Sequence, residues 1–241
     1  MAKIKVGIHT LTNEPEYLTE WVNHYRNYGF DHCFVYLDSS IVSEPNIDYS
    51  NTDYLTYKVW DCKNSPQGQM RAQEDCCKNN QDYDYILMID SDEYLMTKNN
   101  MNIKQVIENL YYIHGDFDAL ALYWRFYGSN PSFLDRQPIE NYRQWHPNNH
   151  IKSLVNPKKV IRFNDPHFAT LLPNTKYIDE LGRKVTSPIG NHTSENIWIK
   201  HTYTRSKSEW EKKVNRKGWY EFYGRKMEEF ENYNKSCVNS D

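Results

Sequence analysis

Three carboxylates follow a short apolar segment of this chain: Asp90, Asp92 and Glu93 come directly after residues 85–89, and only Ser91 separates the two aspartates. Like charges at this spacing repel one another, and burying even one unpaired carboxylate is costly. A divalent cation is the simplest partner for such a cluster, since Mg²⁺ and Mn²⁺ prefer oxygen ligands and often bind one or two carboxylates plus substrate phosphates. The run therefore indicates an enzyme that holds a nucleoside diphosphate through a metal ion.

The alternative is that these acids are ordinary loop residues, because Asp-x-Asp also occurs often by chance. The preceding residues 85–89 favour the metal interpretation, since they are almost wholly apolar, as in a central strand covered on both faces. Ligands of open α/β sheets bind at the carboxyl ends of such strands. We therefore expect the cluster at the functional edge of a sheet.

Composition limits the class of protein. The 241 residues fit one α/β domain, and 20 Tyr with 7 Trp exceed what a core usually needs, so some can line a site for sugars or bases. The net charge of −3 argues against nucleic-acid binding, for which a basic patch is expected. No apolar run approaches the ~18 residues of a membrane span.

The five cysteines are odd in number and include no C-x-x-C pair. Free thiols in a reducing compartment explain this pattern better than disulfides or a zinc site. The N-terminus enters a predicted strand without an apolar leader segment, so a cytoplasmic protein is expected.

The first ninety residues alternate between strand and helix patterns. Strands are expected at residues 5–11, 32–37, 54–60 and 84–89. Asn13 with Glu16 reads as a capping box for a helix that ends at Gly29, with Pro15 in its first turn, and a second helix is expected at 67–78. This order predicts an α/β fold with a mostly parallel central sheet flanked by helices.

The later elements are less regular. Asn102 is expected to cap a helix, and residues 118–126 to form a strand. Residues 131–150 lack periodicity and read as a long ordered loop, which in a compact domain is usually functional. Short strands at 153–155 and 159–163, turns and edge strands at 171–200, and helices within 206–230 complete the chain.

Six segments, taken in order, resemble the family 92 and family 2-like glycosyltransferases of the GT-A fold. They are residues 12–21, residues 28–40, Gln69 with Ala72 ahead of the Asp-Ser-Asp-Glu run, residues 124–130, residues 152–157 and residues 201–206. The resemblance implies one GT-A domain over residues 1–241. Within it, residues 1–95 would form the nucleotide-binding half, 96–205 the acceptor half and 206–241 a C-terminal helical extension.

The resemblance also implies roles for single residues. The expected contacts to the nucleotide are Thr10, Leu11, Asn13, Glu14, Asp38, Gln69, Asp90 and Ser91. Asn13 and Asp38 can equally be a helix cap and a turn former, and either role can coexist with binding.

The metal, expected to be Mn²⁺ or Mg²⁺, would be held by Asp90, Asp92 and His201. An imidazole nitrogen is a good Mn²⁺ ligand, although a lone histidine is more often a structural hydrogen-bond donor. Arg205, Lys207 and Lys213 would neutralise the departing diphosphate, unless they only form a solvated charged face.

The predicted activity is transfer of a sugar from a nucleoside diphosphate sugar, with a UDP-sugar as the leading candidate, to a hydroxyl of a glycan. The resemblance implies inversion at the anomeric carbon, so a carboxylate should deprotonate the acceptor. Asp135 and Glu140 are the candidates, with Asp165 as a third. Trp124, Trp145 and Tyr127 are candidate sugar platforms, although a core position is the stronger expectation for Trp124.

Two alternatives stay open. A sugar nucleotidylyltransferase would normally carry a glycine-rich loop after its first strand, where this chain has Thr-Leu-Thr-Asn-Glu-Pro. A non-catalytic carbohydrate-binding protein on the same fold need not keep the acidic run. Animal members of family 92 often carry a membrane anchor and luminal disulfides, so their expected absence here favours a bacterial enzyme or a viral enzyme in the host cytosol.

Overall fold

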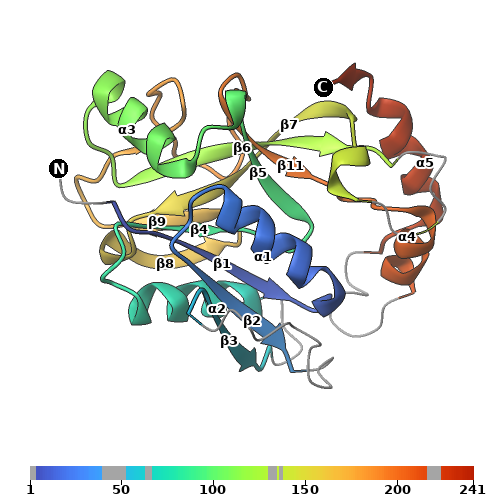
Figure 1. Cartoon of the computed structure of the whole chain (residues 1–241), viewed down its shortest axis with the longest axis horizontal. Coiled ribbons are helices and arrows are strands. Elements are labelled where there is room, and N and C mark those ends of the chain that lie inside the picture. The colour runs from blue at the N-terminus through green and yellow to red at the C-terminus, as the bar shows by residue number, and fades with distance from the viewer. Residues whose placement is uncertain (1–3, 40–52, 63–66, 130–134, 136–137, 216–223) are drawn as a thin grey trace.

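The computed structural model describes residues 4–39, 53–62, 67–129, 135, 138–215 and 224–241 (Figure 1). Within these residues the central sheet has the strands β1 (Val6–Thr12), β2 (His32–Asp38), β3 (Leu55–Trp60), β4 (Tyr85–Met88), β5 (Glu93–Thr97), β6 (Ala119–Tyr127), β7 (Gln144–Val155), β10 (Tyr177–Ile178), β11 (Ile197–His201) and β12 (Asn239–Ser240). Their order across the sheet is β3-β2-β1-β4-β7-β6-β11-β5, with β10 beside β6 and β12 beside β7.

The first half of the sheet is parallel. Strand β1 pairs in parallel with both β2 and β4, and β2 pairs in parallel with β3. Every residue of β4 is buried, as expected for a central strand. The carboxyl ends of these four strands therefore meet at one edge, and the predicted α/β fold is confirmed.

The second half of the sheet contains antiparallel pairs, and this arrangement sets the position of the acidic residues 90–93. Strand β7 is antiparallel to β4 and β6, while β11 is parallel to β6 and antiparallel to β5. Strands β4 and β5 follow each other in the chain, but β7, β6 and β11 lie between them in the sheet. The link at residues 89–92 must therefore cross these three strands, which brings its acids near side chains from much later in the sequence.

Helices cover both faces of the sheet (Figure 1). Helices α1 (Leu18–Asn27) and α3 (Ile103–His114) contribute to one hydrophobic core, and α2 (Gln67–Asn79) contributes to the other. The hairpin of β8 (Val160–Asp165) and β9 (Phe168–Leu171) joins the core of α2. Helices α4 (Lys207–Val214) and α5 (Met227–Ser236) lie together at the right of Figure 1.

The two predicted helix starts have different outcomes. Asn102 forms a capping box with Gln105 at the start of α3, which confirms its role as a cap. The capping box predicted for Asn13 is wrong, because a short 3₁₀ helix at Pro15–Tyr17 precedes α1 and no side chain caps it. Gly29, at φ +83°, follows the end of α1 as expected.

Two other expectations need correction. The loop predicted for residues 131–150 is wrong from Gln144 onward, because β7 begins there and pairs with β6 on one side and β12 on the other. Residues 130–134 and 136–137 lie outside the described residues. Residues 197–201 form no edge strand, since β11 lies between β6 and β5.

The five cysteines are buried and make no disulfide, as the sequence predicts. Among the helices that the structure describes, none combines the length and the apolar composition that crossing a bilayer requires.

Candidate active site

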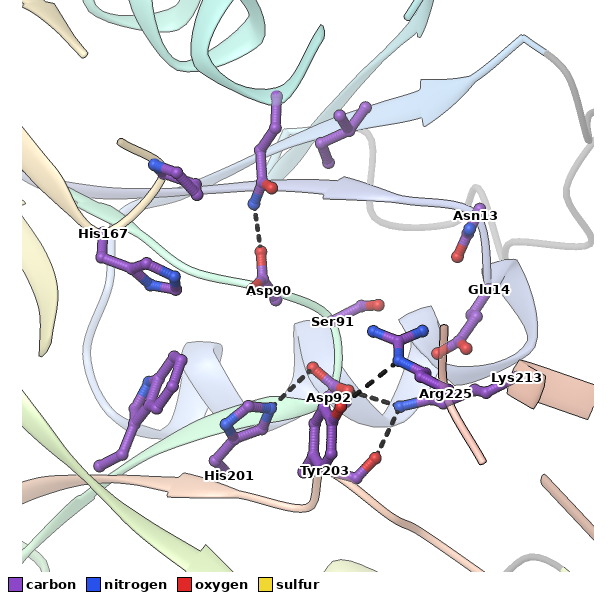
Figure 2. A pocket seen from close by; sticks show the side chains of 14 residues that line it. Asn13, Glu14, Asp90, Ser91, Asp92, His167, His201, Tyr203, Lys213 and Arg225 are labelled. Atoms are coloured by element: carbon purple, nitrogen blue, oxygen red, sulfur yellow. Dashed lines mark hydrogen bonds and ion pairs between the residues drawn. The ribbon is translucent and has the colours of Figure 1, made fainter. Parts of the chain in front are cut away.

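A pocket of about 230 Å³ lies at the carboxyl edge of the parallel strands. Its lining comes from the end of β1, the start of α2, the link between β4 and β5, β6, the β8–β9 turn, β11 with Tyr203 after it, α4, and the segment before α5. The side chains are Leu11, Asn13, Glu14, Gln69, Asp90, Ser91, Asp92, Trp124, Pro166, His167, His201, Tyr203, Lys213 and Arg225 (Figure 2).

Most of the residues predicted to bind the nucleotide or the metal meet in this pocket. They are Leu11, Asn13, Glu14, Gln69, Asp90, Ser91, Asp92 and His201. Thr10 and Asp38 are not among the lining residues: Thr10 is buried within β1, and Asp38 is buried at the end of β2, where it interacts with the thiol of Cys62.

The predicted general bases lie elsewhere. Asp135 and Glu140 are both exposed and are not among the residues that line the pocket. Asp165 uses one carboxylate oxygen to accept a hydrogen bond from the main-chain N–H of His167, at 2.8 Å. The assignment of a general base therefore stays a prediction.

Both carboxylate oxygens of Asp90 have partners within the protein. Gln69 donates to Oδ1, and the Nζ of Lys152 lies 2.7 Å from Oδ2. Lys152 is fully buried on β7 and also lies 3.5 Å from a carboxylate oxygen of Glu93. This lysine belongs to residues 152–157, one of the segments that resemble the family, but only the pairing of β7 with β4 brings it to Asp90.

Asp92 lies between a lysine and a histidine. The Nζ of Lys213 is 2.7 Å from Oδ2, and the Nε2 of His201 is 3.6 Å from Oδ1. Burial opposes ionisation of Asp92, but the positive charge of Lys213, helped by that of Arg205, outweighs it and holds the pKa of this carboxyl well below its usual range. Asp92 is therefore an anion facing the pocket.

His201 ends β11 and is paired across the sheet with Glu93. Its ring stacks on Phe126 at 4.8 Å between centroids, and its Nδ1 is 3.7 Å from a carboxylate oxygen of Glu93. Burial lowers the pKa of His201 and raises that of Glu93, although Lys152 opposes the second shift. Glu93 lies behind the histidine, away from solvent, and His201 presents a neutral Nε2 to Asp92.

The two basic residues predicted beside Lys213 do not line the pocket. Arg205 is buried, with one guanidinium nitrogen 2.9 Å from Glu14 and 3.3 Å from the main-chain oxygen of Ser91. Its φ of +50° is uncommon outside glycine, so the surrounding contacts must hold it in place. Lys207 is exposed and lines a separate groove.

Arg225 is a pocket cation that the sequence reasoning missed. It lines the pocket together with Lys213, and its Nε donates to the hydroxyl of Tyr203 at 3.4 Å. It comes after the last motif that carried the family resemblance, so only the three-dimensional arrangement could reveal it.

The pocket suits a cation that takes most of its ligands from phosphate and water. Asp92 and His201 face each other with one oxygen and one neutral nitrogen, while Asp90 is already bonded to Gln69 and Lys152. Among the described residues, no group of three or more His, Cys, Asp or Glu is arranged to hold a metal ion. Mg²⁺ and Mn²⁺ commonly bind through one or two protein ligands plus substrate phosphates, so two donors fit such an ion.

Of the predicted sugar platforms, only Trp124 lines the pocket. Trp145 instead packs against Arg125, whose guanidinium carbon is 4.1 Å from the ring centroid. Tyr127 donates a hydrogen bond to Asp241 at 3.0 Å. Neither of these two rings is among the pocket-lining residues.

Comparison with known proteins identifies one family, and the distantly similar solved structures include the two described here. The sequence model of glycosyltransferase family 92 matches residues 3–234. No curated protein matches the chain. A mannose-6-phosphate isomerase from Helicobacter pylori is 10% identical with a TM-score of 0.34, and the match covers 55% of this chain and 53% of the isomerase, about half its length.

The second structure is a protein of Bacillus anthracis described as a glucose-1-phosphate thymidylyltransferase, solved in complex with a sucrose. It is 12% identical with a TM-score of 0.37, and the match covers 65% of this chain and 72% of that one. Both TM-scores lie below 0.5, so the fold described above stands on this chain's own structure.

Proposed function

Because this chain belongs to glycosyltransferase family 92 and is therefore a glycosyltransferase, we propose that it transfers a sugar from a nucleoside diphosphate sugar to a hydroxyl of a glycan. A UDP-sugar is the leading candidate donor. The observation that carries the proposal is Asp92, ionised between His201 and Lys213 in a pocket at the carboxyl edge of parallel strands. Ligands of open α/β sheets bind at this edge.

The two sides of the pocket support different parts of the donor. Asn13 and Glu14, at the end of β1, offer polar groups for the nucleoside. Lys213 and Arg225 bring two positive charges to the same pocket, where they would neutralise the diphosphate before and after the sugar leaves. Charge that develops on a leaving group is stabilised best by groups already held in position.

Asp92 and His201 are the residues that would hold Mn²⁺ or Mg²⁺ together with the diphosphate. When bound, such an ion supplies Lewis-acid stabilisation of the leaving phosphate. The protein keeps both donors ready: Lys213 favours the ionised form of Asp92, and burial favours the neutral form of His201. Asp90 would help to form the pocket wall, because its two carboxylate oxygens are already bonded to Gln69 and Lys152.

An inverting reaction also needs a base that removes the proton of the acceptor hydroxyl. Asp135 and Glu140 keep this role in the proposal, on the acceptor side of the chain. Both are exposed and neither lines the pocket, so the true base would have to approach the pocket when the acceptor binds.

Thermal unfolding with nucleoside diphosphates tests the proposal. UDP, GDP and dTDP are added separately, each with Mn²⁺ and with EDTA. A ligand at one hundred times its Kd should stabilise the fold by ~2.7 kcal/mol. We expect one of the three to raise Tm in Mn²⁺ and to raise it much less in EDTA. The anomeric configuration of the transfer product, read by NMR, then tests inversion. No shift with any diphosphate under either condition would contradict the proposed donor class.

A further inference from the structure

Residues 224–241, which we call the strap, connect the pocket to the start of β7. In Figure 1 the strap is the red part of the ribbon, which contains α5 and β12 and runs from beside α4 to the end of the chain. Near the start of the strap, Arg225 lines the pocket, and its Nε donates to the hydroxyl of Tyr203 at 3.4 Å. The strap therefore supplies one of the two cations that are proposed to meet the diphosphate.

The middle of the strap packs against the end of β6. The ring centroid of Tyr233 lies 5.1 Å from that of Tyr203, so α5 supports the tyrosine to which Arg225 is bonded. Asn234 accepts a hydrogen bond from the main-chain N–H of Ser129 at 2.9 Å and donates one to the Ser129 hydroxyl at 3.0 Å. These contacts fix α5 relative to β6, which itself contributes to the pocket wall.

The absence of a side chain at Gly128 allows this close approach. A side-chain carbon at this position would lie 3.0 Å from the amide oxygen of Asn234 and 3.2 Å from the sulfur of Cys237. Both distances are shorter than ordinary van der Waals contact, so a larger residue would push the strap away from β6. The residue type at position 128 is thus matched to the position of the strap.

The far end of the strap is anchored by charged groups. Asp241 lies 3.5 Å from a guanidinium nitrogen of Arg125 and 4.0 Å from the Nζ of Lys200. It also accepts a hydrogen bond from the hydroxyl of Tyr127 at 3.0 Å. The side chains of Arg125 and Lys200 are only 14% and 5% exposed, and among the described residues no other carboxylate forms an ion pair with either. Two largely buried cations therefore depend on one carboxylate, and loss of its charge would leave both uncompensated.

The main chain of the strap reinforces this anchor. Strand β12 pairs antiparallel with the first residues of β7, and the main-chain N–H of Asp241 donates to the main-chain oxygen of Arg143 at 3.1 Å. The strap is therefore attached at both ends, to the pocket through Arg225 and to the sheet through β12 and Asp241.

We propose that Asp241 is a positioning residue for the donor diphosphate. It anchors the strap to Arg125 and Lys200, and the anchored strap holds Arg225 at the pocket. A long side chain loses rotational freedom when it binds a ligand, and less of that freedom remains to be lost when its backbone and its neighbours are already fixed. Asp241 is not among the pocket-lining residues, so it would act only through the strap. This assignment rests on the proposed function.

A double-mutant cycle tests the assignment. Calorimetry in Mn²⁺ measures the Kd of UDP and of uridine for wild type, Asp241→Asn, Arg225→Gln and the double variant, or of the matching GDP or dTDP pair if the screen selects that base. Asp31→Asn is the matched control, because Asp31 also pairs with a partly buried lysine, Lys104 at 2.6 Å, but lies beside the first residue of β1, at the opposite end of that strand from the pocket. Tm is measured for every variant.

We expect Arg225→Gln to weaken UDP binding about tenfold and Asp241→Asn about fivefold, with the Kd of uridine within about twofold of wild type in both. The double variant should bind UDP no more weakly than Arg225→Gln alone, because the anchor acts only through that arginine. Asp241→Glu keeps the charge and should retain most of the affinity. The control should lower Tm without changing either Kd.

Several outcomes would overturn the assignment. Unchanged UDP affinity in either single variant would show that the strap does not act on the diphosphate, and additive losses in the double variant would show that Asp241 acts by another route. Equal losses for UDP and uridine, or the same loss in the control, would reduce Asp241 to a structural role. If wild type binds none of the diphosphates, the proposed function fails; if it binds one and the Asp241 variant matches wild type, only this assignment fails.

Discussion

Lys213 and Asp92 are 121 residues apart in the chain, yet the Nζ of the lysine lies 2.7 Å from a carboxylate oxygen of the aspartate. Helix α4 supplies the cation and the β4–β5 link supplies the anion, so the pair joins the C-terminal helices to the edge of the sheet. The same nitrogen also donates to the main-chain oxygen of Tyr203 at 2.9 Å. The ammonium group is thus held at the pocket wall by the protein's own groups.

Lys213→Gln should weaken binding of the nucleoside diphosphate about tenfold while leaving the bare nucleoside unaffected, because a charged hydrogen bond to phosphate is lost and the base is not touched. Calorimetry with both ligands measures the effect. Lys212→Gln is the control, since Lys212 is exposed on the same helix. Equal weakening of both ligands would show that Lys213 acts only by holding Asp92.

Asp92→Ala should abolish sugar transfer and leave the fold intact. The substitution removes the anion that faces His201 and Lys213, and it leaves the buried Lys213 ammonium without its carboxylate, so the variant should fold with a lower Tm. Transfer from a labelled donor, together with Tm, measures the two effects, and Asp116→Ala is a control at an exposed position. A folded Asp92→Ala protein that transfers sugar at a near-normal rate would contradict the metal interpretation.

His201→Ala should reduce Mn²⁺-dependent binding of the nucleoside diphosphate far more than binding of the nucleoside. The reason is that its neutral Nε2 is the second donor facing the space beside Asp92. Titration of each ligand in Mn²⁺ and in EDTA separates the metal-dependent part of its affinity from the part that needs no metal. If both ligands lose the same affinity in both conditions, His201 is a packing residue between Phe126 and Trp124.

Stability should fall as the pH drops below about 6.5. Burial lowers the pKa of His9 to about 3, against an ordinary value of 6.5 in the unfolded chain. Below pH 6.5 the unfolded chain therefore takes up a proton that the buried His9 does not bind in the folded state. The free energy of unfolding falls by up to ~1.4 kcal/mol per pH unit as a result, until about pH 3. Urea unfolding between pH 7.5 and 4.5 measures the slope. His9→Gln should flatten it, and an unchanged slope would show that His9 is not responsible.

Asp135→Asn and Glu140→Gln test the acceptor side. Removing the true general base should lower sugar transfer ~10²-fold or more, with donor affinity unchanged. Initial rates at saturating donor and acceptor measure this. If both variants keep the wild-type rate, the base lies elsewhere, and Asp165 is then the next candidate, although it already holds the turn of His167.

The sequence predicted best where the deciding interactions are local. The box between Asn102 and Gln105 is correct because both partners belong to one helical turn. The box proposed for Asn13 with Glu16 fails because a 3₁₀ turn that begins after Glu14 precedes the helix, and Glu14 pairs with the distant Arg205. Local pattern could not have shown that contact.

Non-local pairing also explains the missed part of β7. Residues 144–150 lack the alternation of a half-buried strand, and their strand conformation depends on β6 and β12. The motifs pointed to Asp92 and His201, which line the pocket, because strand ends and family segments mark them in the chain. Trp124 was suggested only as a platform, and His167 and Arg225 were not singled out, because neither lies in a quoted motif and only the fold brings them to the pocket.

The route of the chain between β4 and β5 has a consequence for how the site comes into being during synthesis. Asp90 and Asp92 emerge from the ribosome early, but their partners Lys152, His201 and Lys213 emerge long after them. Until β7, β6 and β11 have entered the sheet, the link between β4 and β5 has nothing to cross. Pairings this distant in sequence form slowly. A nascent chain therefore carries Asp92 without its lysine partner until residue 213 has been made, so the pocket at the strand ends can form only after that point.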